Sequence, residues 1–283
     1  GDDNTADGII YCDNHCENFP NDIRFGTTND PSTATQLAQW IEESDATSAT
    51  IWVKLPSDDS DIIYMFVGNS SASQYSDGDD TFLLFDDFND NNLDATKWTD
   101  VSTLDAYISE HDQILECHTD GGTTSKHRGY ARSNEQFDKN IALRTKAKCV
   151  AGAGEAKNGV VYLLMQWDGT HTANYDTATS AFIMYNWEEK PRFRISDGTT
   201  ALATDSSTIY DNEDWHVYEF RCYNSGGTNY LYAYYDDNEV LSATSTTDYT
   251  TRYIGLTSRE KSAHTYYCLL YTSPSPRDLS TSR

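Results

Sequence analysis

Short runs of apolar and aromatic residues, each closed by Gly, Asn, Asp or Ser, recur along most of the chain. Such runs include ATIWVKLP (49–56), DIIYMFVG (61–68), GVVYLLMQW (159–167), SAFIMYNW (180–187) and NYLYAYYD (229–236). In WHVYEFRCY (215–223), Tyr218, Phe220 and Cys222 alternate with charged residues, which is the period of a strand with one buried face. Between the runs lie hairpin signals such as NSGGT (224–228). This pattern predicts an all-β protein.

The strands fall into two groups. SSASQYSDGDD (70–80) is a polar stretch of small turn-forming residues, and a new strand pattern begins after it. We therefore predict two β-sandwich domains, 1–80 and 81–267, because many short strands at regular spacing favour sandwiches. Only TATQLAQWIEE (33–43) has a pattern that a short helix would also show.

The charge of the chain excludes one class of partner. The 283 residues include 45 acidic and 20 basic side chains, a formal net charge of −25. Nucleic acids are bound by Lys and Arg, so we predict no nucleic-acid partner. No apolar run approaches the ~18 residues of a membrane-spanning helix, so no membrane span is expected in this fragment. Solubility at high salt, cation binding and a merely solvated surface all remain open as reasons for the acidity.

The first domain carries several motifs of one family in that family's order. They are YCDNHCENF (11–19), NDIRF (21–25), QWIEE (39–43), ATIWVKLP (49–56) and IYMFVGNSSASQYSDGDDTFLLFDDF (63–88). Together they resemble the domain of unknown function 2341 family over about residues 8–88. The resemblance implies a protein of an archaeal or bacterial surface and implies no chemistry. The leading strands of that family are missing, so we expect an N-terminally truncated β domain.

The second domain opens with FDDFNDNNLDATKW (85–98) and later contains DWHVYEFRCYNSGGTNYLYAYYDDNEVL (214–241). Both segments resemble concanavalin A-like lectin/glucanase (laminin G-like) sandwiches. The resemblance implies a jelly roll that hosts lectins, hydrolases or plain adhesion modules. In the hydrolases of this fold, Glu-x-Asp-x-Glu on one strand supplies the carboxylate pair of a retaining glycosidase. That triplet is absent from the sequence, so we predict no catalytic residues.

Glycan binding requires flat aromatic faces beside hydrogen-bonding groups. The candidates are Trp167, Asp168, His171, Tyr185, Trp187 and Arg194, in QWDGTH and across YNW…RFR. The competing interpretation is that these aromatic residues pack in the core or at its rim. The period of two places Tyr185 and Trp187 on one face and Asn186 on the other.

Two possible metal or cysteine sites remain open. Asp86, Asp87 and Asp90 lie in an Asp- and Asn-rich turn that could supply oxygens to a structural Ca²⁺, although such residues also dominate ordinary turns. Cys12 and Cys16 flank His15, but zinc would need two further ligands, which no second pair supplies. The family resemblance favours a local disulfide, with two ordinary thiols as the alternative. Cys149 and Cys222 are expected in the core.

The last segment, CLLYTSPSPRDLSTSR (268–283), departs from the composition of the rest of the chain. A sandwich of this family closes with a strand that commonly resembles DWVRVRKY. The string present instead is similar to the translated end of a widely used transposase sequencing adaptor. We therefore expect a metagenomic fragment open at both ends. We also expect a jelly roll lacking its last strand, and a non-native adaptor-derived tail at 268–283 that packs poorly and leaves an open sheet edge.

These observations predict a non-catalytic adhesion or carbohydrate-binding protein, secreted or on the cell surface of a prokaryote, with an archaeon as the expected source. Its expected partners are glycans or surface polysaccharide, within a larger parent polypeptide. One alternative is a glycan-active hydrolase or lyase without the usual catalytic signature. Another is a structural spacer in a large surface protein. Structural Ca²⁺ is the only cofactor expected.

Overall fold

The chain divides into two compact units, Gly1–Leu83 and Leu84–Arg283. The structure, a computed structural model, describes residues 3, 8–56, 62–103, 106–118, 128–150, 160–170, 180–187, 192–198, 200–258 and 264–274. Among these residues, none forms a helix long and apolar enough to cross a membrane. The prediction of an all-β chain is confirmed, since the described elements are nineteen strands and one four-residue helix.

The first unit is built from two antiparallel strand pairs. Its elements are β1 (Arg24–Gly26), β2 (Gln39–Ser44), β3 (Ala49–Val53), β4 (Tyr64–Phe66) and α1 (Gly78–Thr81), with β1 paired to β4 and β2 to β3. Ile23, Phe25 and Leu37 form its core. The stretch 33–43 is not helical, because Trp40 pairs with Trp52 across β2 and β3 and both rings pack near Phe82. Tertiary pairing thus overrides the helical pattern of that stretch.

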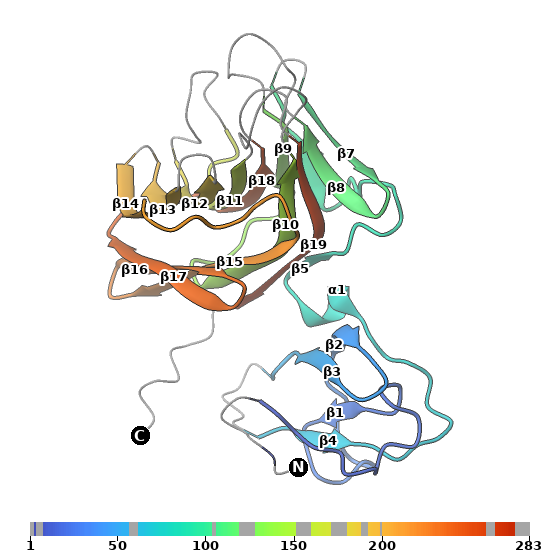
Figure 1. Cartoon of the computed structure of the whole chain (residues 1–283). Coiled ribbons are helices and arrows are strands. Elements are labelled where there is room, and N and C mark those ends of the chain that lie inside the picture. The colour runs from blue at the N-terminus through green and yellow to red at the C-terminus, as the bar shows by residue number, and fades with distance from the viewer. Residues whose placement is uncertain are drawn as a thin grey trace. The chain divides into compact units, whose positions relative to one another are not determined.

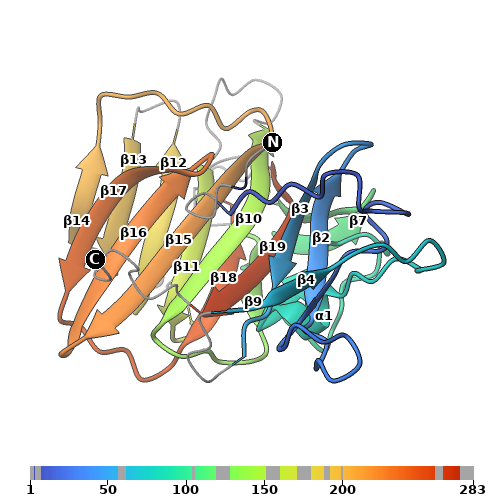
Figure 2. The same cartoon turned by 90° about the horizontal axis from the view of Figure 1, so that it is seen from below.

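The second unit is a two-layer sandwich (Figure 1). One layer of eight strands runs β17 (Asn238–Ser245), β16 (Thr228–Tyr235), β15 (His216–Ser225), β10 (Ile141–Val150), β19 (His264–Pro274), β8 (Ile114–His118) and β7 (Tyr107–His111), with β5 (Leu84–Asp86) also paired to β19. The other layer of seven strands runs β14 (Thr200–Asp205), β13 (Arg192–Asp197), β12 (Phe182–Trp187), β11 (Val160–Trp167), β18 (Tyr253–Thr257), β9 (Tyr130–Ser133) and β6 (Trp98–Asp100). The broad face of the first layer is visible in Figure 2, where β17, β16, β15 and β10 lie side by side.

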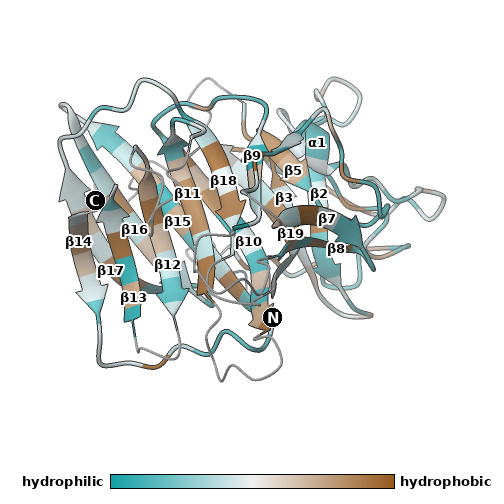
Figure 3. Ribbon diagram, turned by 90° about the horizontal axis from the view of Figure 1, so that it is seen from above, coloured by the Kyte–Doolittle hydropathy of each residue, from teal (hydrophilic) through white to brown (hydrophobic). Residues whose placement is uncertain are grey.

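Alternate residues of the facing strands build the core between the layers. Val161, Leu163 and Met165 of β11 point inward and meet Phe220 and Cys222 of β15, all fully buried. Figure 3 shows the hydrophobic residues of β11 as brown bands along the strand. The expectation that Cys149 and Cys222 belong to the core is confirmed, and burial raises the pKa of each thiol to about 12.

The prediction that the tail packs poorly and leaves an open sheet edge is wrong for residues 268–274, whereas its adaptor origin stays a prediction. The sheet position that was expected to be empty is filled by β19, which pairs with β10 along its length, with β8 at residues 264–267 and with β5 at residues 270–272. Leu270 and Tyr271 are at most 2% exposed. Leu, Tyr and Thr are strong strand formers, and a segment of that composition can complete a sheet whatever its origin. Residues 275–283 lie outside the described residues.

The pairing of β19 changes at the first residue of this tail. Lys146 of β10 pairs with Leu269 and Ala147 pairs with Tyr267, so that Cys268 is an extra residue in the ladder. A β-bulge of this kind accommodates one unmatched residue and locally bends the strand. On its other side, β19 pairs with β8 before Cys268 and with β5 after it.

Candidate functional site

The outer face of the seven-stranded layer carries a continuous cluster of aromatic rings. On β11 and β12, the residues that alternate with the core-facing ones point to this side, and Tyr162 pairs directly with Tyr185. We call the cluster the aromatic face; it consists of Tyr130, Tyr162, Trp167, Tyr185 and Trp187. Three of the residues predicted to contact a glycan, Trp167, Tyr185 and Trp187, are therefore brought together.

Two arginines of the neighbouring strand β13 lie over these rings. The guanidinium carbon of Arg192 is 5.8 Å from the centre of the Trp187 ring, and that of Arg194 is 5.6 Å from the centre of the Tyr185 ring. Arg194 also donates from Nε to Thr204 Oγ1 at 3.1 Å. Cation–π contacts of this kind contribute about 0.5–1 kcal/mol each at exposed sites. Arg194 thus lies where it was predicted, and Arg192 is a neighbour that the sequence reasoning missed.

The rings themselves are well covered. Tyr185 is 5% exposed, Trp187 is 6% exposed and Trp167 is 0% exposed. Arg192 and Arg194 are only half-buried, and Thr204 is exposed. A ligand that approaches this face would meet the guanidinium groups and the Thr204 hydroxyl before it meets the rings.

Trp167 is anchored as a packing residue. Its Nε1 donates to the carbonyl of Thr170 at 2.6 Å, and a Cβ on Gly255 would lie 2.7 Å from its ring. Only glycine at position 255 therefore leaves room for the indole. Asp168 accepts from the amide and the hydroxyl of Thr170, both at 2.9 Å, and so closes a turn. His171 lies outside the described residues.

The aromatic face offers no carboxylate pair on its two central strands. The described residues of β11 and β12 that point to this side are Val160, Tyr162, Leu164, Trp167, Ile183, Tyr185 and Trp187, none of which is acidic. Asn186 points inward, as expected, and donates to the hydroxyl of Tyr218 at 3.1 Å. The described outer positions of these two strands therefore hold no carboxylate pair of the kind that a retaining glycosidase uses.

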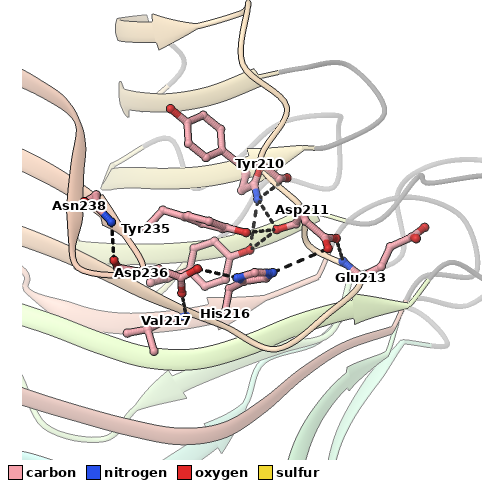
Figure 4. A network of polar contacts seen from close by, with 10 residues as sticks. Tyr210, Asp211, Glu213, His216, Val217, Tyr235, Asp236 and Asn238 are labelled. Atoms are coloured by element: carbon pink, nitrogen blue, oxygen red, sulfur yellow. Dashed lines mark hydrogen bonds and ion pairs between the residues drawn. The ribbon is translucent and has the colours of Figure 1, made fainter.

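A second cluster of polar residues surrounds His216 at the start of β15 (Figure 4). Its Nδ1 lies 2.7 Å from Asp236 Oδ2, its Nε2 lies 3.8 Å from Asp211 Oδ2, and its ring stacks on Tyr235 with centres 4.7 Å apart. Asp236 Oδ1 also accepts from the amide of Val217 at 2.9 Å.

The contacts around His216 link the loop before β15 to the turn between β16 and β17. Asp211 belongs to the segment between β14 and β15, and its carbonyl accepts from the Tyr235 hydroxyl at 2.9 Å. Asp236 lies in the turn between β16 and β17. No predicted site residue is part of this cluster. The contact between His216 and Asp236 could have been predicted from the sequence. Antiparallel pairing of WHVYEF with NYLYAYYDD places His216 next to Asp236.

The acidic turn predicted to bind calcium is already engaged with the protein. Asp86 accepts from the Trp98 indole at 2.8 Å and from the Phe88 amide at 3.0 Å, and Asp87 accepts from the Asn89 side chain at 2.6 Å. Among the described residues, no three His, Cys, Asp or Glu side chains come together as metal ligands. The residues as arranged therefore do not fit a cation site, and calcium binding stays a prediction, which calorimetric titration with Ca²⁺ would test.

Glu110 of β7 is the acidic neighbour of this turn that the sequence did not reveal. Burial, together with a hydrogen bond that the protonated Glu110 carboxyl donates to the Asp90 carboxylate, raises its pKa to about 7. Its Oε1 and the Oδ1 of Asp90 both accept from the Asn92 amide, at 3.2 Å and 2.9 Å.

This arrangement predicts a pH dependence of stability. The folded pKa of Glu110 is raised, so the folded state holds the proton more tightly than the unfolded state. The stabilisation is fully present below the ordinary pKa near 4.5 and is lost as the pH rises through about 7. Chemical denaturation between pH 5 and pH 8 should show a smaller loss of stability in Glu110→Gln than in the unaltered protein. Parallel curves for the two proteins would contradict this account.

In the first unit, Cys12 and Cys16 are free thiols that lie beside each other. Burial and a hydrogen bond with Cys12 raise the pKa of Cys16 to about 12. The disulfide between them stays a prediction, which mass spectrometry of the oxidised protein would test.

The first comparison concerns the sequence. Residues 20–101 match the family described as Domain of unknown function (DUF2341). The resemblance seen in the motifs of the first unit is thereby confirmed. No curated protein matches the sequence significantly.

The second comparison concerns solved structures, whose concanavalin A-like lectin/glucanase sandwiches resemble the second unit. One comes from work on endo-acting O-glycanases that prominent members of the human gut microbiota express to initiate mucin breakdown; it has a TM-score of 0.51 and 12% identity, and the match covers 68% of this chain and 99% of that one. Another is the metal-free carbohydrate recognition domain of Emp46p, with a TM-score of 0.50, 10% identity, and coverage of 69% and 100%. At these identities the likeness confirms the jelly-roll fold and nothing further.

Proposed function

We propose that the second unit is a non-catalytic carbohydrate-binding module that binds glycan on the outer face of its seven-stranded layer. The observation that carries this proposal is the placement of Arg192 and Arg194 over Trp187 and Tyr185. Guanidinium groups donate several directed hydrogen bonds, and the rings beneath them hold those donors in place. The fold shared with a carbohydrate recognition domain agrees with the proposal.

The absence of acidic residues from the described outer positions of β11 and β12 favours binding over hydrolysis. Retaining hydrolysis needs two carboxyl groups about 5–5.5 Å apart, and these positions hold aliphatic and aromatic side chains. A role in adhesion, secreted or on the surface of a prokaryotic cell, follows from the proposed binding and from the resemblance of the first unit. The hydrolase or lyase remains the alternative that product analysis must exclude.

One observation favours a second function, the structural spacer. Tyr185 and Trp187 are at most 6% exposed, as they would be if the aromatic face were only a packed outer layer. In that case, the arginines serve to cover the rings and bind no ligand.

A glycan array probed with the whole chain separates the three functions. We expect binding of at least one glycan class and no release of shorter products when that glycan is incubated with the protein. Absence of binding across the array would favour the spacer. Release of oligosaccharides would overturn the non-catalytic proposal.

A further inference from the structure

The first unit contains a groove that none of the functions above uses. Its volume is about 620 Å³, and its lining includes Asp22, Gln36, Phe66, Asn69, Ser71 and Ser73. Volumes of about 300–1,000 Å³ are typical of small-molecule sites. The groove lies within the unit, beside the β1–β4 pair, and its geometry does not depend on the second unit.

Hydrogen bonds from several segments fix one wall of this groove. Asp22 accepts from the amides of Glu17 at 2.7 Å and Gly68 at 2.9 Å. Arg24 donates to the carbonyl of Ser73 at 2.6 Å, and Asn18 donates to the carbonyl of Ala72 at 2.8 Å. A wall held in this way is formed before a ligand arrives, which reduces the ordering cost of binding.

The polar groups that line the groove are mostly uncharged and available. Within the described part of the chain, the side-chain amide of Gln36 and the hydroxyls of Ser71 and Ser73 form no hydrogen bond. The Asn69 side chain uses its oxygen to accept from the Ser71 amide at 3.0 Å, which leaves its NH₂ group to donate. Asp22 Oδ1 is buried and has no hydrogen-bond partner among the described residues. A buried acceptor without a donor is costly, and a ligand hydroxyl that reached it would remove that cost.

The charges near the groove disfavour an anionic ligand. The guanidinium of Arg24 already donates to the carbonyls of Asn21, Ile23 and Ser73 and lies over the Tyr75 ring. Asp22 is an acidic wall residue, and the whole chain has a net charge of −25. The Phe66 ring adds an apolar surface beside the amides and hydroxyls. Uncharged donors and acceptors around one aromatic ring suit an uncharged, hydroxyl-rich ligand.

We propose that this groove binds an uncharged saccharide unit, whose apolar face packs on Phe66 and whose hydroxyl groups bond to Gln36, Asn69 and Ser73. The site is separate from the aromatic face of the second unit. It does not rest on the function proposed for that unit.

The test uses the full chain carrying Arg192→Ala and Arg194→Ala, so that a glycan site on the second unit does not contribute. Isothermal titration with cellotriose, mannotriose and chitotriose should detect binding of at least one of them, and trigalacturonate should bind more weakly. Adding Gln36→Ala and Ser73→Ala should weaken that binding at least tenfold, which corresponds to about 1.4 kcal/mol. The matched control is Ser44→Ala, an exposed residue of β2 outside the groove lining; it should leave the affinity unchanged.

Three results would overturn the proposal. They are absence of binding by all three neutral trisaccharides, equal affinity with and without the groove substitutions, and tighter binding of trigalacturonate. The two arginine substitutions remove the glycan site proposed on the second unit, so binding measured in this background reports on the groove alone. The site on the second unit is tested separately, with the unaltered chain on the glycan array. Circular dichroism of the groove variant shows whether it is folded. Phe66→Leu is a second variant, which retains an apolar side chain and removes the ring.

Discussion

Replacing Glu219 by alanine should lower the free energy of unfolding by about 3–5 kcal/mol, the usual cost of removing one partner from a buried ion pair. Glu219 lies on β15 and is 5% exposed. Its Oε2 accepts from Arg144 at 3.1 Å, and its Oε1 accepts from the Nε of Arg221. The alanine variant removes the carboxylate that pairs with Arg221 and leaves Arg144 with the exposed Asp237 as its ion-pair partner. Urea denaturation of the full chain, followed by tryptophan fluorescence, measures the change.

The matched control for this prediction is Glu239→Ala. Glu239 has the same charge and lies nearby on β17, but it is exposed. Exposed substitutions usually change stability by less than about 0.5 kcal/mol. If both variants lose equally little stability, then the Arg144–Glu219–Arg221 cluster does not stabilise the sandwich as described.

The second large effect is expected at Trp98. This residue is 2% exposed, packs on Phe88 and donates from Nε1 to the buried Asp86 carboxylate at 2.8 Å. Trp98→Ala should cost at least the roughly 3–5 kcal/mol typical of a buried Trp-to-Ala change, because it also leaves Asp86 without one of its donors. Burial already raises the pKa of Asp86, and the loss of this donor should raise it further.

A comparison with Trp98→Phe separates packing from hydrogen bonding at this site. Phenylalanine fills most of the volume but cannot donate to Asp86, so the expected loss is about 1.5–3 kcal/mol, as for a hydrogen bond to a charged group. Thermal and urea unfolding of both variants provide the measurement. A phenylalanine variant as stable as the unaltered protein would show that the bond to Asp86 contributes little.

Much of the fold was predictable because alternation and turn chemistry act locally. The period of two in WHVYEFRCY correctly places Phe220 and Cys222 in the core, and that in YNW correctly separates Asn186 from Tyr185 and Trp187. These features depend only on the strand itself.

What the sequence did not predict depends on pairing between distant segments. TATQLAQWIEE has a pattern compatible with helix, yet its second half is a strand because β3 pairs with it. The tail was expected to pack poorly, but residues 268–274 occupy a sheet position beside β10. The different origin inferred from its unusual composition stays a prediction, whereas its packing is decided by strand propensity and by the space available.

The candidate sites likewise contain residues that a local pattern relates and residues that only the folded chain brings together. Trp187, Tyr185 and Arg194 were predictable from neighbouring strands of one hairpin, whose register brings Tyr185 opposite Arg194. Glu110 lies on β7 and Asp90 in the connection between β5 and β6, and no local pattern relates them. The burial of the aromatic rings agrees with the competing interpretation that they pack in the core or at its rim.

Glycan binding by the second unit is proposed to depend on Arg192 and Arg194. The most direct measurement is the dissociation constant of the strongest glycan from the array, determined for the unaltered chain, for the Arg192→Ala/Arg194→Ala variant and for Lys146→Ala. Lys146 is a matched exposed cation of β10, on the other layer. We expect at least tenfold weaker binding for the double arginine variant and no change for Lys146→Ala. Equal affinity in all three proteins would contradict the claim.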